Sequence, residues 1–119
     1  MKTNQETFDE MVQNVKEQKQ PCLVDGECKY LTPSGNKCIV GGLIPVDRYT
    51  VDMEDKTADA YPVYDILESL GHDSEFCRDV QTRYDRLAMT SKRTSLSWQD
   101  VLKDDLRNFA QKLGLKLNW

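Results

Sequence analysis

The chain is 119 residues long, with 39% hydrophobic residues, 30% charged residues and a formal net charge of −4. This length fits one globular domain spanning residues 1–119, and the apolar content is too high for a disordered chain. The negative charge disfavours a general nucleic-acid binder, which normally carries a basic surplus. No apolar run is long enough to span a bilayer and no signal peptide begins the chain, so we expect a cytoplasmic protein that does not bind membranes.

The first predicted helix covers residues 4–18. Thr3 and Glu6 have the spacing of a capping box, in which each side chain satisfies a free amide at the start of a helix. Apolar residues then recur at helical spacing and form one stripe. Pro21 ends the helical segment, because the residue before a proline avoids the α region. The sequence therefore predicts one amphipathic helix at this end of the chain.

A β-hairpin is predicted around residues 28–40. The turn sequence Thr-Pro-Ser-Gly-Asn at 32–36 combines a proline for the first corner with Gly35 for the left-handed corner. Apolar residues on either side supply the two strands. Cys28 and Cys38 flank this hairpin, so we expect them to be neighbours, and a cytosolic setting favours free thiols.

Three further helices are predicted in the second half of the chain. A short helix begins at Pro62 and ends at Gly71. The next covers about 75–88. The last is capped by Ser97 and ends at Gly114 in a pattern typical of a Schellman motif.

Together these elements predict an α+β fold, in which a small antiparallel sheet packs against about four α-helices. A hairpin alone is only marginally stable, so the helices must cover one of its faces. The final residues 115–119 alternate between apolar and polar, which predicts either an edge strand or burial of Trp119.

No metal or cofactor is expected. Cys22, Cys28 and Cys38 lack the closely spaced pairs of a structural zinc site. A cysteine nucleophile needs a histidine base, and the only histidine is His72, which could approach Cys77. A loop histidine next to an aspartate is more typically a solvated cap residue. We therefore expect that the chain is not an enzyme, with a Cys77–His72 pair as an alternative.

A longer pattern carries a resemblance to a known family. Residues 28–49 contain Cys-x-Tyr-x4-Gly-x-Lys-Cys-x2-Gly-x-Leu-Ile-Pro-x3-Tyr, followed by Met53-Glu54. This resembles a family of small uncharacterised proteins of tailed bacteriophages and prophage regions. Val-Gln-x-x-Tyr-Asp at 80–85 resembles the family's Leu-Gln-x-x-His-Asp, with tyrosine where histidine is common. The resemblance implies a phage-related origin and supplies no activity.

From this resemblance and the lack of a catalytic pattern, we expect a non-enzymatic binding protein that engages a host protein, for example one used in defence, and modulates or inhibits it. Polar and aromatic residues that follow an apolar strand can be presented to a partner by the loop. The local alternative is that Arg48 pairs with a nearby acid and Tyr49 caps the core. An acidic segment could occupy a basic surface of the partner. The candidate partner-binding residues are Asp47, Arg48, Tyr49, Glu54, Asp55 and Asp59.

An alternative function is a sponge that sequesters a nucleotide-type signalling molecule. Arg78, Arg83 and Arg86, with Tyr84 among them, could hold phosphates and stack a base. Arg78 and Arg86 are too far apart for one helical turn, so the cluster would need help from Arg48 or from a second chain. The competing interpretation is that these bases pair with the acids of residues 52–77 inside the fold. The partner and the oligomeric state stay open.

Overall fold

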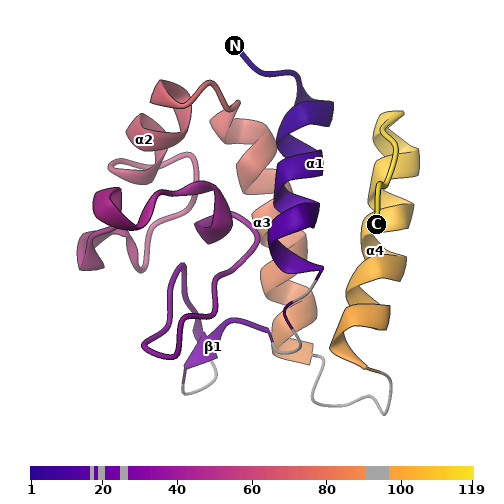
Figure 1. Cartoon of the computed structure of the whole chain (residues 1–119), viewed down its shortest axis with the longest axis horizontal. Coiled ribbons are helices and arrows are strands. Elements are labelled where there is room, and N and C mark those ends of the chain that lie inside the picture. The colour runs from indigo at the N-terminus through magenta and orange to yellow at the C-terminus, as the bar shows by residue number, and fades with distance from the viewer. Residues whose placement is uncertain (17, 19–20, 25–26, 91–96) are drawn as a thin grey trace.

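The computed structural model describes residues 1–16, 18, 21–24, 27–90 and 97–119. Four α-helices dominate it: α1 (Asn4–Val15), α2 (Val63–Ser69), α3 (Ser74–Thr90) and α4 (Trp98–Leu113). Figure 1 shows α1 and α3 beside α4, with α2 and the irregular segment that precedes it on the side away from α4. The four predicted helices are thus confirmed. No helix in the described residues is both long enough and apolar enough to cross a membrane.

Three phenylalanines join the long helices. The ring of Phe8 on α1 lies 6.5 Å from that of Phe76 on α3 and 6.4 Å from that of Phe109 on α4, measured between centroids. Phe76 and Phe109 complete the triangle at 6.4 Å. Such edge and tilted contacts add to the apolar area that each ring buries. The core therefore sits between α1, α3 and α4, and the buried part of residues 22–58 extends it on the other side.

The predicted sheet is the main correction. Strand β1 (Leu23–Val24) pairs antiparallel with β2 (Glu27–Cys28), which makes a ladder of only two residues on each side. In the predicted hairpin around residues 28–40, one isolated antiparallel bridge joins Leu31 to Lys37. The fold is therefore helix-dominated, and in the described residues the predicted small antiparallel sheet is reduced to these two pairings.

The predicted return strand fails because the chain turns into the core. Ile39 and Val40 are both fully buried, whereas a half-buried strand buries alternate residues. The segment then enters the 3₁₀ turn η1 (Gly41–Leu43). A Cβ at Gly41 would lie 2.0 Å from the carbonyl oxygen of Tyr30. Glycine is required there because two main-chain segments meet at this point.

Two further 3₁₀ turns follow, η2 (Val46–Arg48) and η3 (Val51–Met53). They lie in the segment between the predicted hairpin and α2, for which the sequence predicts neither a helix nor a strand. Each turn is closed by a hydrogen bond between main-chain groups three residues apart, as between the Arg48 amide and the Pro45 carbonyl at 2.9 Å. These turns give the segment before α2 a defined shape.

Helix ends follow the predicted caps closely. The capping box of Thr3 and Glu6 is present at α1, and the Ser97 hydroxyl accepts a hydrogen bond from the Asp100 amide at α4. Gly114 adopts φ +71°, and the Leu115 amide donates to the Ala110 carbonyl at 2.8 Å. Helix α1 ends at Val15 instead of residue 18, although residue 17 lies outside the described residues.

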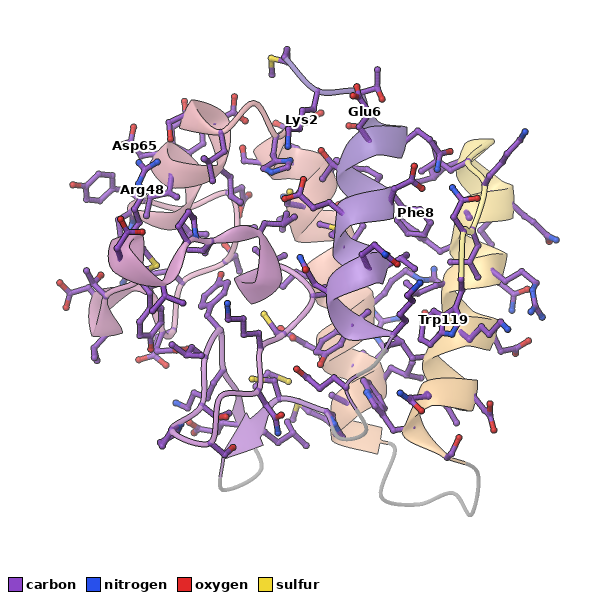
Figure 2. All side chains as sticks on the ribbon, in the orientation of Figure 1. Lys2, Glu6, Phe8, Arg48, Asp65 and Trp119 are labelled. Atoms are coloured by element: carbon purple, nitrogen blue, oxygen red, sulfur yellow. The ribbon has the colours of Figure 1, made fainter. Side chains whose placement is uncertain are left out.

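The last residues run back along α1 without forming a strand. The Gln5 side chain accepts from the Lys116 amide at 2.8 Å and donates to the Lys116 carbonyl at 2.9 Å. These are the two main-chain groups that a neighbouring strand would otherwise pair with. Trp119 is half-buried and packs against the core. Figure 2 shows Phe8 and Trp119 between α1 and α4. The predicted edge strand is not formed by residues 115–119, and the alternative, burial of Trp119, is met in part.

Candidate functional site

The Tyr30 side chain organises the surface between β2 and α3. Its hydroxyl donates to the main-chain carbonyl of Lys56 and accepts from the Gln81 amide at 2.7 Å. The Gln81 carbonyl oxygen in turn accepts from the Ala58 amide at 2.9 Å. Satisfied networks of this kind hold their members in one arrangement. Residues 54–58 are therefore fixed between α3 and the segment that follows β2.

Glu54 has two hydrogen-bond partners within the fold. One carboxylate oxygen accepts from the Tyr30 amide at 3.1 Å, and the other accepts from the Tyr49 hydroxyl at 2.6 Å. Burial raises the pKa of Tyr49 to about 12, and the bond to this carboxylate contributes to the shift. Hydrogen bonds to a charged group are the stronger kind. Glu54 therefore links Tyr49 to the main chain at Tyr30 and holds these two segments together.

A hollow of about 500 Å³ lies on one side of Glu54, and we name it the Tyr49 hollow. It is bounded by apolar side chains and by a charged rim. Val51, at its edge, is 77% exposed. The lining residues are Lys29, Leu31, Thr32, Pro33, Tyr49, Val51, Glu54 and Asp55.

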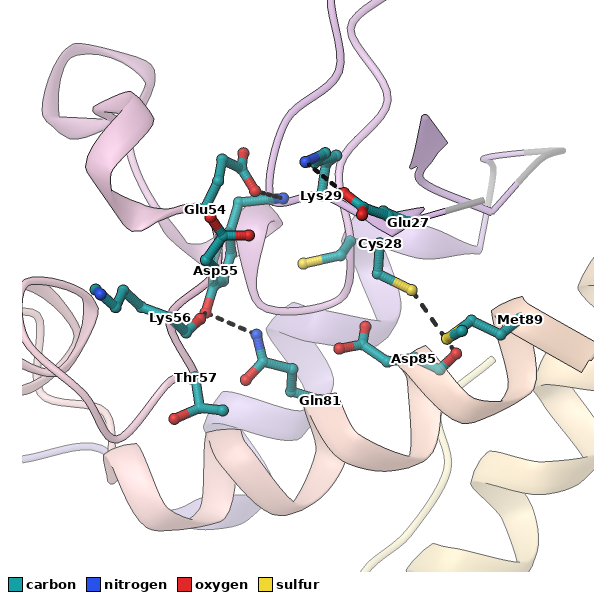
Figure 3. A pocket seen from close by; sticks show the side chains of 12 residues that line it. Glu27, Cys28, Lys29, Glu54, Asp55, Lys56, Thr57, Gln81, Asp85 and Met89 are labelled. Atoms are coloured by element: carbon teal, nitrogen blue, oxygen red, sulfur yellow. Dashed lines mark hydrogen bonds and ion pairs between the residues drawn. The ribbon is translucent and has the colours of Figure 1, made fainter. Parts of the chain in front are cut away.

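A second cavity, of about 340 Å³, shares Lys29, Glu54 and Asp55 with the hollow, and we name it the Asp85 pocket. In Figure 3, Gln81 and Asp85 reach from α3 toward Cys28 and the segment that carries Glu54. Gln81 and Asp85 are four residues apart, so they share one face of α3. The remaining lining residues are Glu27, Cys28, Tyr30, Cys38, Lys56, Thr57 and Met89.

The Asp85 carboxylate lacks an ion-pair partner among the described residues. Burial raises its pKa to about 6, and a hydrogen bond from the Cys28 thiol offsets part of this effect. Lys29, which lines the same pocket, forms its ion pair with Glu27 at 3.3 Å. At neutral pH the pocket therefore holds a mostly ionised carboxylate that forms no ion pair with a described residue.

Three of the four cysteines, Cys22, Cys28 and Cys38, take part in hydrogen bonds through their sulfur atoms. All four are free, and Cys28 and Cys38, predicted to be neighbours, line the same pocket. The Cys28 thiol donates to the Asp85 carbonyl at 3.7 Å, and the Cys38 sulfur accepts from the Gly41 amide at 3.1 Å. Burial raises the pKa of Cys28 to about 12 and that of Cys38 further. A reactive cysteine instead needs a lowered pKa, because the thiolate is the nucleophile.

His72 is not the solvated cap residue that the sequence suggested. Its side chain is 1% exposed, because Gly71 at φ +90° turns the chain back toward α1. There Nδ1 lies 2.7 Å from the Thr7 hydroxyl, and Nε2 lies 3.9 Å from a Glu10 oxygen. Burial lowers the pKa of His72 and raises that of Cys77 to about 12. Both ring nitrogens thus face α1.

The predicted partner-binding residues divide into two groups. Tyr49, Glu54 and Asp55 meet at the Tyr49 hollow, and the exposed Asp47 and Arg48 lie on η2. Arg48 donates to the Ser69 hydroxyl at 3.0 Å, where the local interpretation expected an acid. Asp59 does not join the hollow. Its carboxylate accepts from Arg78 at 3.1 Å and from Thr57 at 2.6 Å.

The predicted basic cluster is not assembled on one surface. Arg83 makes two hydrogen bonds to Asp105, at 3.0 and 3.2 Å, and its guanidinium lies 4.9 Å from the Phe109 ring centroid. Tyr84 is 1% exposed and meets the Trp98 ring edge-on, so it cannot stack a ligand base. The Arg78 pair with Asp59 fits the interpretation that these bases pair internally.

Among the described residues, no group of three or more His, Cys, Asp or Glu side chains lies close enough together to hold a metal ion.

Exposed apolar residues were missed by sequence reasoning. The described residues expose seven large hydrophobic side chains, and four of them lie between residues 46 and 64: Val46, Val51, Tyr61 and Tyr64. The part of this segment before Pro62 has no helical or strand periodicity from which exposure could be predicted, whereas Tyr64 lies on α2. Asp85 was also missed, although its spacing from Gln81, beside the apolar stripe of the helix, was a usable signal.

Comparisons of the chain with protein-family models, with curated proteins and with solved structures found no match.

Proposed function

We propose that this chain is a non-enzymatic binding protein that engages a host protein and modulates or inhibits it. The observation that carries the proposal is the exposure of four large apolar side chains between residues 46 and 64, which we take as the proposed surface: Val46, Val51, Tyr61 and Tyr64. Val51 also lines the Tyr49 hollow. Exposed apolar groups gathered on one side of a protein commonly mark an interaction site. The host origin of the partner rests on the resemblance to phage proteins.

The hollow suits the centre of an interface. Leu31, Pro33 and Tyr49 offer apolar walls to one side chain of a partner. Anchors that fill such hollows supply most of the binding energy in protein complexes, while a polar rim excludes water. The hydrogen bond from Tyr49 to Glu54 holds the hollow open before binding, which lowers the cost of ordering it. Asp55, exposed at the rim, supplies a negative charge for a basic partner.

The test is capture of a partner from lysate of bacterial host cells by the tagged chain and by two variants. Val51→Ser combined with Tyr61→Ser removes apolar area from the proposed surface, where these side chains are 77% and 75% exposed. Leu113→Ser is the control, because this residue on α4 is 51% exposed and lies outside the surface. Glu54 is left intact because its two hydrogen bonds support the fold.

We expect the wild-type chain and the Leu113 variant to retain one protein in stoichiometric amount, and the double variant to lose at least about tenfold in affinity for it once that protein is purified. Unfolding midpoints should agree among the three chains. Equal retention by all three, or no retained protein at all, would contradict the proposal.

A further inference from the structure

The Asp85 pocket differs from the Tyr49 hollow in charge. Four acids and two lysines line it, and the positions of these lysines matter. Lys29 is occupied by Glu27, and the Lys56 side chain points away from Asp85 in Figure 3. Glu54 already has its two donors. Asp55 is exposed to solvent, so the partly buried Asp85 carboxylate is the charge in this pocket that a ligand could best balance.

The pocket walls suit a short aliphatic chain. Cys28, Cys38 and Met89 contribute sulfur-bearing, weakly polar surfaces, and Tyr30 also lines the pocket. A volume of about 340 Å³ is near the lower end for small-molecule sites. It accommodates a group of the size of a lysine or arginine side chain. An anionic ligand is disfavoured by the excess of carboxylates.

We propose that the Asp85 pocket binds a small organic cation, an alkyl ammonium or alkyl guanidinium group, whose charge pairs with the Asp85 carboxylate. The alkyl part lies against Cys28 and Met89, and the cation replaces the water that otherwise solvates the carboxylate. Charge-assisted hydrogen bonds between such groups and a carboxylate are short and strong. The cation can be a free amine or a basic side chain presented by another protein, and both have the same chemistry.

The probes are n-butylguanidinium and n-butylammonium, with n-butylurea as a neutral compound of nearly the same shape as the guanidinium. Binding is followed at pH 7.5 through the backbone amide signals of the ¹⁵N-labelled full chain. We expect saturable changes at Cys28, Thr57 and Asp85, with dissociation constants in the millimolar range typical of ligands of this size. Butylurea should bind at least about tenfold more weakly.

Two variants assign the site. Asp85→Asn keeps the shape of the side chain and removes its charge, and it should lower the affinity for both cations by at least about tenfold. Asp79→Asn is the control, because Asp79 is on the same helix, exposed and paired with Arg78. The control should bind as the wild type does. Equal binding by the Asp85 variant, or no saturable change with either cation, would overturn the proposal.

A third probe separates the two sources of the cation. N-acetyl-arginine methylamide carries the same guanidinium on a polypeptide backbone. Tighter binding than that of butylguanidinium supports a partner's side chain as the ligand, and weaker binding supports a free cation. The proposal is independent of partner capture by the Tyr49 hollow, since the Val51 and Tyr61 variant leaves the lining of the Asp85 pocket unchanged.

Discussion

Replacing Asp85 with asparagine should stabilise the protein at neutral pH. The carboxylate is partly buried, it has no ion-pair partner in the described residues, and its pKa is raised from 3.8 to about 6. Asparagine has nearly the same shape, and the main-chain carbonyl of residue 85, which accepts the hydrogen bond from the Cys28 thiol, is unchanged by the substitution. The variant therefore removes a desolvated charge without leaving a cavity.

The magnitude follows from the pKa. A rise from 3.8 to about 6 corresponds to about 3 kcal/mol at full weight. Water reaches part of this side chain, which screens the effect, so we expect about 1–2 kcal/mol. Because the pKa is higher in the folded state, protonation favours folding. Below about pH 4 the carboxyl is protonated in both states, and its burial does not lower the free energy of unfolding of the wild type through a charge. This free energy falls as the pH rises from 4, and the loss is complete once the pH has passed 6.

Urea unfolding followed by tryptophan fluorescence, in steps from pH 5 to pH 8, provides the measurement. The advantage of the variant should be complete at pH 8 and about half as large at pH 5. Asp79→Asn should show no comparable pH-dependent difference from the wild type. The reasoning is refuted if the Asp85 variant is no more stable than the wild type at pH 8, or if its advantage does not change with pH.

Four further substitutions, one of them a control, test the fold by the same unfolding assay. Gly41→Ala should cost about 3 kcal/mol or more, because its Cβ would meet the Tyr30 carbonyl oxygen at 2.0 Å. Gly35→Ala, at φ +92° with no atom nearby, should cost only about 1 kcal/mol, and equal losses would show that crowding at Gly41 is not the cause. Tyr30→Phe should cost about 1–3 kcal/mol, because the Gln81 amide loses its hydrogen-bond acceptor, and an unchanged midpoint would mean that this network contributes nothing. Thr3→Ala should cost about 1 kcal/mol through loss of the capping box, and no loss would show that the cap is replaced by water.

Local sequence patterns predicted the four helices and the caps at several of their ends. Apolar spacing and capping are properties of neighbouring residues, so Thr3, Ser97 and Gly114 could be assigned to helix ends without knowledge of the fold. The burial of Trp119 was one of two outcomes that the alternation of the last residues allowed. Which outcome occurs depends on Gln5, which lies more than 100 residues away in the chain and hydrogen-bonds both the amide and the carbonyl of Lys116.

The conformation of the described part of residues 22–44 and the candidate site depend on contacts between segments that are distant in the chain. Turn residues at 32–36 predicted a hairpin, but the burial of both Ile39 and Val40 against the helices drew the chain into a helical turn. The same packing took Tyr84 into the core and away from any ligand. The Asp85 pocket joins residues from β2, the loop after η3 and α3, and the absence of an ion pair between Asp85 and the described residues depends on where each charge lies after folding. Local sequence patterns cannot predict such a pocket, because burial and charge balance are set by contacts between distant segments.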